Sequence, residues 1–237
     1  MNNMKVECGS LGYMTHVRNI LRLDDCHRNV RIDKFDILDG YFLNFNNAYV
    51  KIEVRFIFGI DFQVEMTILF PKNSNDCIEN ISRLIISVQD DAVRNEIRSC
   101  TNYLQRKKDV NLAVSILKKI SLAVGERKLI LDTLLLQLQD HFKIIKLEDG
   151  GVLIICNARG QNYFKSHWII QFDCSTHNII DSVDFTVTRN VPFYSTVKGS
   201  MDNLVQPYLP YNFKVEYWWC IIEALQAEAD LPVFEII

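Results

Sequence analysis

The stretch Asn111–Phe142 reads NLAVSILKKISLAVGERKLILDTLLLQLQDHF, and the organisation of the whole chain follows from it. At about 100° per residue its apolar side chains fall within a stripe roughly 100° wide, which is typical of an amphipathic helix. The stripe contains Ile116, Leu117, Ile120, Val124, Leu131, Leu134, Leu135, Leu138 and Phe142. Such a helix would be about 48 Å long, so we expect it to be shared between domains, broken near Gly125, or braced by a second element.

Strand-like sequence precedes this helix. Apolar and polar residues alternate over 48–58 and again over 61–70, a pattern that predicts two half-buried strands. A strand over Ile37–Phe45 joins the first of them through Asn46-Asn47, because asparagine tolerates the backbone of a tight turn. Together with a weaker strand signal at Leu84–Val88, these segments predict an antiparallel meander with one face in water.

Two helices are expected to flank this meander. Residues 11–23 have the spacing of a short helix. Asp90-Asp91 supplies an N-cap and negative charge for a second helix. The apolar positions of that second helix are Val93, Ile97, Cys100 and Leu104.

The same order recurs after the long helix. Asp149-Gly150 is a strong hairpin signal. The predicted strands around and after it are Phe142–Leu147, Val152–Cys156, Phe164–Asp173 and Val183–Val187. Ile154 and Ile155 are adjacent, so their strand is a candidate for burial on both faces. A loop containing Pro192, Gly199, Pro207 and Pro210 is expected next, followed by a last helix over Phe213–Gln226.

We therefore predict an α+β fold of two similar units, each an antiparallel sheet with helices packed on one face. Residues 1–10 form a flexible lead in this scheme. The first domain spans 11–109, and the second spans 110–237 and begins with the long helix.

Composition narrows the class of protein. The net charge is −3 and the chain has no long basic run, which argues against direct nucleic-acid binding. No apolar run approaches the roughly 18 residues needed to span a membrane, and no signal peptide is evident. The seven cysteines are scattered, which favours a reducing, intracellular compartment over a disulfide framework or zinc site.

No pattern of catalytic or cofactor-binding residues is evident. The five histidines are isolated, and neither a phosphate-binding glycine loop nor a nucleophile elbow occurs. Cys220 lies in an apolar helix with no histidine near it in sequence, so we expect a buried structural thiol. The sequence therefore predicts a protein that is not an enzyme and uses no metal or cofactor.

The densest aromatic cluster is Tyr217-Trp218-Trp219. On a helical wheel Trp218 joins the apolar side and Trp219 lies among polar residues, so one tryptophan is expected in the core and the other at the surface. Trp219 either packs under the proline-rich loop or the C-terminal tail, or anchors a partner. We name Trp219, Tyr217, Tyr208 and Tyr211 as candidate partner-binding residues, and an open sheet edge as an alternative docking surface.

The order helix, antiparallel meander, proline-containing loop and final helix resembles the RWD fold. Two such units joined by a long helix resemble the C-terminal tandem RWD module of the outer-kinetochore scaffold of the KMN network, the blinkin or kinetochore-null family. The resemblance spans about residues 11–228 and is carried locally by Tyr41–Phe70, Val114–Leu138 and Met201–Leu225.

This resemblance implies a nuclear adaptor of the centromere and kinetochore that supports chromosome segregation in mitosis. It implies docking of the scaffold onto the Mis-twelve complex, through a tail peptide or helix of that complex, and in some lineages binding of a Zwint-type coiled coil. The family's checkpoint-recruiting repeats do not occur here, which fits a C-terminal fragment of a longer scaffold.

Two other functions fit the same layout. Centromere proteins O and P of the inner kinetochore also carry tandem RWD units. A ubiquitin-conjugating-like enzyme is a third possibility, because its fold is related to RWD, but the expected His-Pro-Asn followed by a catalytic cysteine is missing. Asn190-Val191-Pro192 does not replace that motif.

Overall fold

The computed structural model describes residues 30–42, 47–58, 62–71, 81–138, 141–158, 160–188, 192–206, 209 and 211–230. The contacts divide the chain into two units. The first contains Met1–Arg94 and Arg98–Ser121, and the second contains Asn95–Ile97 and Leu122–Ile237. The predicted lead at 1–10 and the predicted helix at 11–23 lie outside the described residues.

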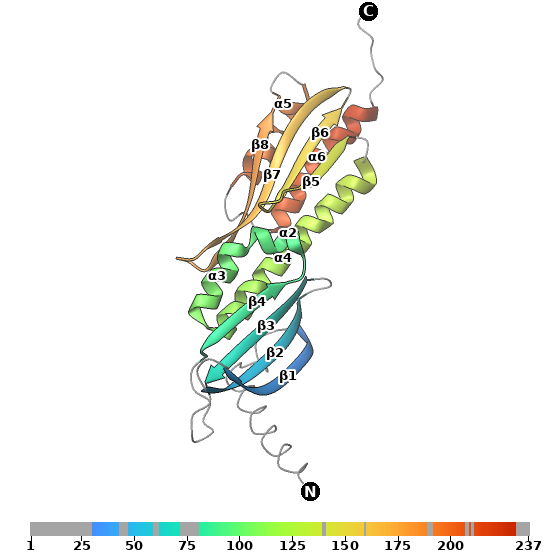
Figure 1. Ribbon diagram of the computed structural model, residues 1–237. Coiled ribbons are helices and arrows are strands. Elements are labelled where there is room, and N and C mark those ends of the chain that lie inside the picture. The colour runs from blue at the N-terminus through green and yellow to red at the C-terminus, as the bar shows by residue number, and fades with distance from the viewer. Residues whose placement is uncertain are drawn as a thin grey trace, which may run out of the picture. The chain divides into compact units, whose positions relative to one another are not determined.

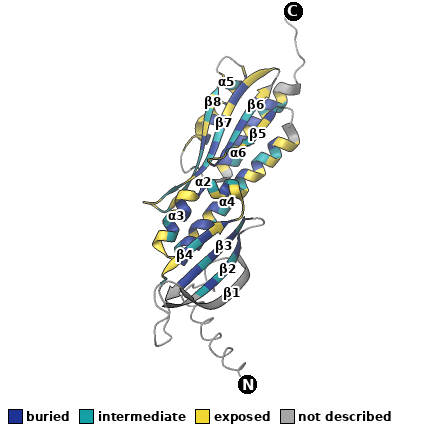
Figure 2. Cartoon of the chain, in the orientation of Figure 1, coloured by how far each residue is buried: buried dark blue, intermediate teal, exposed yellow. Residues whose placement is uncertain are grey.

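The first unit contains an antiparallel sheet of four strands in the order β1-β2-β3-β4 (Figure 1). Their bounds are Val30–Phe42, Asn47–Phe58, Phe62–Pro71 and Arg83–Val88. The alternation in β2 is confirmed up to Phe56, because Ile52, Val54 and Phe56 are buried between half-buried Lys51, Glu53 and Arg55 (Figure 2). Ile57, expected on the polar face, is buried instead. In β3 the alternation is confirmed over 62–68. β1 begins at Val30, seven residues before the predicted start at Ile37, and the weak signal at 84–88 is a real strand.

Two short helices follow β4, namely α2 over Asp91–Glu96 and α3 over Arg98–Lys107. The predicted N-cap is confirmed, since Asp90 Oδ1 accepts hydrogen bonds from the backbone N–H groups of Ala92 and Val93 at 2.9 and 3.1 Å. The one predicted helix is interrupted by a turn at Ile97. All four predicted apolar positions of this segment are buried.

The second unit has a four-stranded antiparallel sheet in the order β5-β6-β7-β8. The bounds are Phe142–Lys146, Val152–Ala158, Gln161–Asp173 and Asn178–Val187. The β5–β6 hairpin turns at Gly150, whose φ of 109° suits glycine, and a Cβ there would lie 2.4 Å from the Cα of Glu96. Ile154 is fully buried and Ile155 only half-buried, so burial of β6 on both faces was a wrong expectation.

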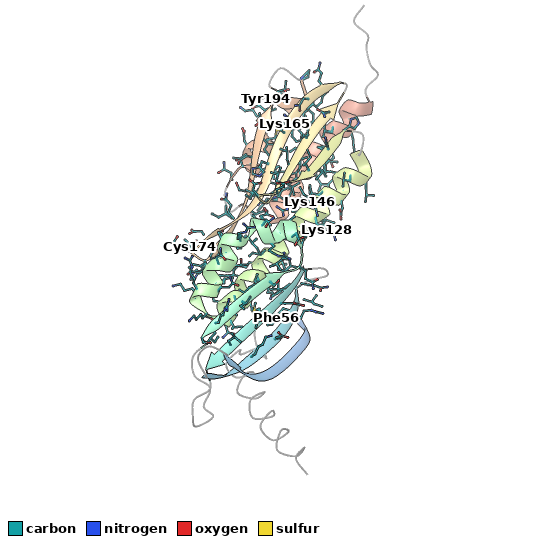
Figure 3. The ribbon with its side chains drawn as sticks, viewed as in Figure 1. Phe56, Lys128, Lys146, Lys165, Cys174 and Tyr194 are labelled. Atoms are coloured by element: carbon teal, nitrogen blue, oxygen red, sulfur yellow. The ribbon has the colours of Figure 1, made fainter. Side chains whose placement is uncertain are left out.

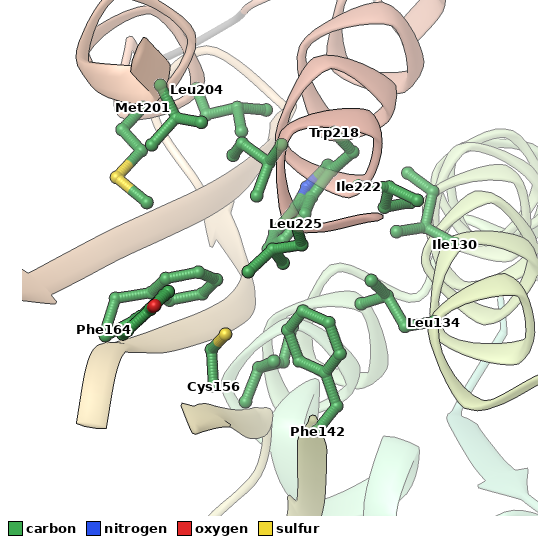
Figure 4. Close-up of a cluster of buried hydrophobic side chains, with 14 of the residues drawn as sticks. Ile130, Leu134, Phe142, Cys156, Phe164, Met201, Leu204, Trp218, Ile222 and Leu225 are labelled. Carbon is green, nitrogen blue, oxygen red and sulfur yellow. The ribbon is translucent and has the colours of Figure 1, made fainter. Parts of the chain in front are cut away.

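Helices cover one face of this second sheet and complete its core (Figure 4). Trp168 of β7 stacks on Trp218 of α6, the helix Tyr211–Asp230, with ring centroids 5.5 Å apart and planes 12° from parallel. The core also draws on the second half of the long helix α4, Val110–Leu138. Its helical members are Ile130, Leu134, Phe193, Val197, Met201, Leu204, Trp218, Ile221, Ile222 and Leu225.

The loop expected after β8 is in part a helix, α5, which spans Pro192–Leu204. The prediction was wrong because proline and glycine were read as loop formers. Pro192 occupies the first helical turn, where its fixed φ is compatible with a helix and its missing N–H costs nothing. The buried residues Phe193, Val197, Met201 and Leu204 then recur at helical spacing.

The helix α4 is one continuous element of 29 residues and is not broken at Gly125. The residues of α4 up to Ser121 belong to the first unit, and those from Leu122 belong to the second. The division between the units therefore lies within the helix, whereas the predicted boundary at 109–110 lies at its start. The single stripe drawn from sequence was wrong in the second half, where Ala123, Arg127 and Ile130 are buried and Leu135 is exposed. The prediction assumed one buried face along the whole helix, whereas its two halves bury different faces.

Gly125→Ala is expected to stabilise the second unit by about 0.5–1 kcal/mol, because alanine loses less backbone entropy in a helix. Gly125 is exposed in the middle of α4, and a Cβ added there would meet no atom within 4 Å. Urea denaturation followed by circular dichroism measures the change. Gly150→Ala is the contrasting control and should destabilise the protein, because its Cβ would collide with Glu96.

Candidate protein-interaction groove

The two adjacent tryptophans of α6 have opposite environments, as predicted. Trp218 is 0% exposed and forms part of the core, whereas Trp219 is 39% exposed. Neighbouring residues of a helix point about 100° apart, so one can be buried while the next faces solvent. An exposed tryptophan leaves a large apolar ring available for contact.

Trp219 lies at the edge of a small groove between α4 and α6. The groove has a volume of about 90 Å³. From α4 it is lined by Leu129, Ile130 and Thr133, and from α6 by Val215, Trp218, Trp219 and Ile222. All of these side chains belong to the second unit, and only one of them, Thr133, is polar.

Exposed leucines recur on the side of α4 that carries Leu129. Leu122, Leu129 and Leu136 are 55%, 57% and 83% exposed. They follow one another at intervals of seven residues, which is close to two helical turns, so they form one stripe on the helix surface. This stripe on the second half of α4 was not predicted, because the sequence pattern assigned the apolar face of the helix to the core.

The α6 side of the groove is acidic. Glu216 and Glu223 are exposed and lie near Trp219 on the helix surface. The single cation of α6, Lys214, is buried. Among the residues that the structure describes, no basic side chain is placed in an ion pair with either glutamate.

A buried polar network lies in the same unit. Lys214 Nζ donates to the Asp181 carboxylate at 2.7 Å and to the Asp181 carbonyl oxygen at 2.6 Å. The Trp168 indole N–H also donates to Asp181. Glu126 of α4 is electrostatically coupled to this pair: burial, and next the charge of Asp181, raise the pKa of its carboxyl to about 7, and Lys214 opposes the shift. The hydrogen bonds of this network link β7, β8 and α6.

Stability should fall as pH rises because of Glu126. Its pKa is raised from 4.5 to about 7 in the folded protein, so folding favours the protonated carboxyl. This contribution is fully present below pH 4.5 and is lost between pH 4.5 and about 7, an effect on the order of 1–2 kcal/mol after allowance for partial exposure. Glu126→Gln is expected to flatten the decline in the free energy of unfolding, measured by urea titration from pH 4.5 to 8. An unchanged slope in the variant would contradict the assignment.

The four predicted partner-binding residues do not lie together at one site in the described part of the structure. Trp219 lies at the groove, as described above. Tyr217 is half-buried against the core of the second unit and does not line the groove. Tyr211 begins α6 but its side chain lies outside the described set, as does Tyr208 entirely.

The predicted alternative surface, a sheet edge, can be assessed at β4. Ile86 N–H donates to the Gln105 side chain at 2.9 Å, and Arg94 donates to the Val88 carbonyl at 2.7 Å. These side chains already occupy two of the outward-facing peptide groups that an added strand would need. A polar depression of about 510 Å³ adjoins this edge. We place the candidate site at the α4–α6 groove because of its apolar lining and the exposed ring of Trp219.

A buried ion pair is the most important feature that sequence reasoning missed. Both nitrogens of the Arg127 fork donate to the Glu96 carboxylate at 2.7 Å. The side chains are 6% and 1% exposed. Glu96 also accepts from the backbone N–H of Ile170 in β7. No local signal indicates this pair, since the two residues are 31 positions apart and both residue types are usually exposed.

The prediction that Cys220 is buried was wrong, because its thiol is exposed on α6. Cys174 is exposed at the turn between β7 and β8 (Figure 3). Cys100 and Cys156 are buried, and desolvation raises the pKa of each thiol to about 12. Within the described ranges, no cluster of three or more His, Cys, Asp or Glu side chains has the arrangement of a metal site.

A comparison with models of known protein families finds no match for this chain, and a comparison with curated protein sequences finds none either. None of the helices in the described part of the chain is long and apolar enough to cross a membrane.

Proposed function

We propose that this chain is a non-enzymatic adaptor that binds a partner protein in the α4–α6 groove. The observation that carries the proposal is the row of exposed apolar side chains, Leu122, Leu129 and Leu136, beside the exposed ring of Trp219. Single exposed leucines are common on soluble proteins, but three on one side of a helix, one of them lining a groove with an exposed tryptophan, favour an interaction surface.

The partner we propose is the Mis-twelve complex of the outer kinetochore, with the chain acting at centromeres in the nucleus during chromosome segregation. The resemblance to a tandem RWD scaffold module supports this assignment. Two successive units of antiparallel sheet and helices are compatible with it. A Zwint-type coiled coil is a second partner under the same proposal.

The direct test mixes the purified chain with recombinant Mis-twelve complex and follows co-elution and heat of binding. A stable complex is expected, and Trp219→Ala should weaken it by about 30-fold or more, as a hot-spot residue does. Cys174→Ser, at an exposed position away from the groove, is the control and should bind normally. Absence of this complex, with retention of other constitutive centromere subunits, would favour a function like that of centromere proteins O and P.

A further inference from the structure

The geometry of the groove specifies the shape of its ligand. The exposed leucines of α4 repeat every seven residues over about 21 Å, the length of a helix of about 14 residues. Glu216 and Glu223 on α6 are also seven residues apart. A seven-residue repeat on a receptor matches the repeat of an amphipathic helix, whose apolar side chains recur at the same interval.

The charge of the groove specifies the chemistry along one side of that ligand. The exposed face of α6 beside Trp219 carries two carboxylates, and its lysine is engaged with Asp181. The second half of α4 carries both signs, in exposed Lys128 (Figure 3) and in exposed Asp132. Only the α6 flank therefore attracts a ligand by charge, and it attracts a basic one.

We propose that the groove binds an amphipathic helix of a partner protein whose apolar face repeats every seven residues and whose flank toward α6 carries lysine or arginine. The proposal rests on the function proposed above and names the kind of partner segment that the same site takes. Leu129 and Trp219 contact the apolar face of the helix, and Glu216 and Glu223 pair with its basic flank.

Other occupants fit the charge less well. A second copy of this chain would bring its own carboxylates from α6 against the same acidic side. The segment 231–237 reads LPVFEII, and its only charged residue, Glu235, is acidic. Nucleic acid and anionic membranes are repelled for the same reason.

The test uses two designed helical peptides of about 21 residues, three seven-residue repeats with leucine on one face. One carries lysine on one flank and the other carries glutamate at the same positions. Binding of each labelled peptide to the full chain is measured by fluorescence anisotropy. The lysine peptide is expected to bind at least about tenfold more tightly, and the difference should shrink at high salt, where exposed charges are screened.

Two matched variants locate the binding site. Leu129→Glu should weaken the lysine peptide by about 30-fold or more, because it places a charge in the groove. Leu135→Glu changes an exposed leucine of the same helix that does not line the groove, and binding should change by less than about threefold. Equal losses in the two variants would overturn the proposed location.

A charge reversal tests the acidic side. The double variant Glu216→Lys with Glu223→Lys should reverse the preference, so that the glutamate peptide binds more tightly. Asp202→Lys, on an exposed position of α5, should leave the preference unchanged. An unaltered preference in the double variant would overturn the assignment of the basic flank.

Four further outcomes would identify a different occupant of the groove or separate the two proposals. A homodimer that dissociates on Leu129→Glu would overturn the proposal in favour of a second copy. Peptide binding that appears only after removal of 231–237 would show that this segment fills the groove. If the lysine peptide binds but the Mis-twelve complex does not, the groove inference stands and the kinetochore proposal fails. If the Mis-twelve complex binds but the lysine peptide does not, the kinetochore proposal stands and the groove inference fails.

Discussion

Arg127→Met is expected to lower the free energy of unfolding of the second unit by about 3–5 kcal/mol. The substitution leaves the Glu96 carboxylate, 1% exposed, without either of the two guanidinium bonds that neutralise it. A buried charge that loses its partner retains the full cost of its removal from water. Urea denaturation at neutral pH, followed by circular dichroism, measures the loss.

Two further variants test whether this loss of stability comes from the unpaired charge of Glu96 or from the change of side chain at position 127. Glu96→Gln combined with Arg127→Met should recover more than about 1 kcal/mol relative to Arg127→Met alone, because a neutral amide oxygen can still accept from the Ile170 N–H. Lys128→Met, at an exposed cation of the same helix, should cost less than about 1 kcal/mol. A cost below 1 kcal/mol for Arg127→Met itself would show that the pair is open to water in solution.

Trp218→Ala and Trp219→Ala form a matched pair with opposite expected results. Trp218→Ala should cost about 3–5 kcal/mol of stability, because it empties a fully buried site that stacks on Trp168. Trp219→Ala should cost less than about 1 kcal/mol, since that ring is partly in water. Its effect should appear instead in partner binding.

Tryptophan fluorescence provides an independent check of this pair. Trp168 and Trp218 are buried, so acrylamide should quench chiefly Trp219. Trp219→Phe should therefore remove most of the quenchable emission, and Trp218→Phe should leave it in place. A large loss of stability in Trp219→Ala, with unchanged partner affinity, would mean that Trp219 acts as a core residue.

Local sequence patterns predicted most of the strands because their cause is local. Alternation over 48–58 reflects the twofold repeat of side chains along a strand, which any strand with one buried face must show. The Asp90 cap was predictable for the same reason, since its carboxylate bonds to N–H groups two and three residues away. The helix α5 was missed because the chemistry of Pro192 depends on whether it begins a helix or ends one.

The candidate site was only half predictable. The exposure of Trp219 follows from its place on the helical wheel of α6, and that prediction is confirmed. The stripe of Leu122, Leu129 and Leu136 was not foreseen, although these residues lie opposite the predicted apolar stripe on the helical wheel, because exposed leucines are common and the sequence does not show what packs against them. Which face of α4 is buried depends on what packs against it.

By itself the sequence determined most of the strands, the order of the two sheet units and the one tryptophan of α6 that faces solvent. Each of these depends on side-chain periodicity within a few residues. Only the tertiary structure decided that Glu96 and Arg127 meet inside the second unit, that α4 runs unbroken through Gly125, and that a leucine stripe lies open beside Trp219. These features depend on contacts between residues far apart in the chain, which no local repeat encodes.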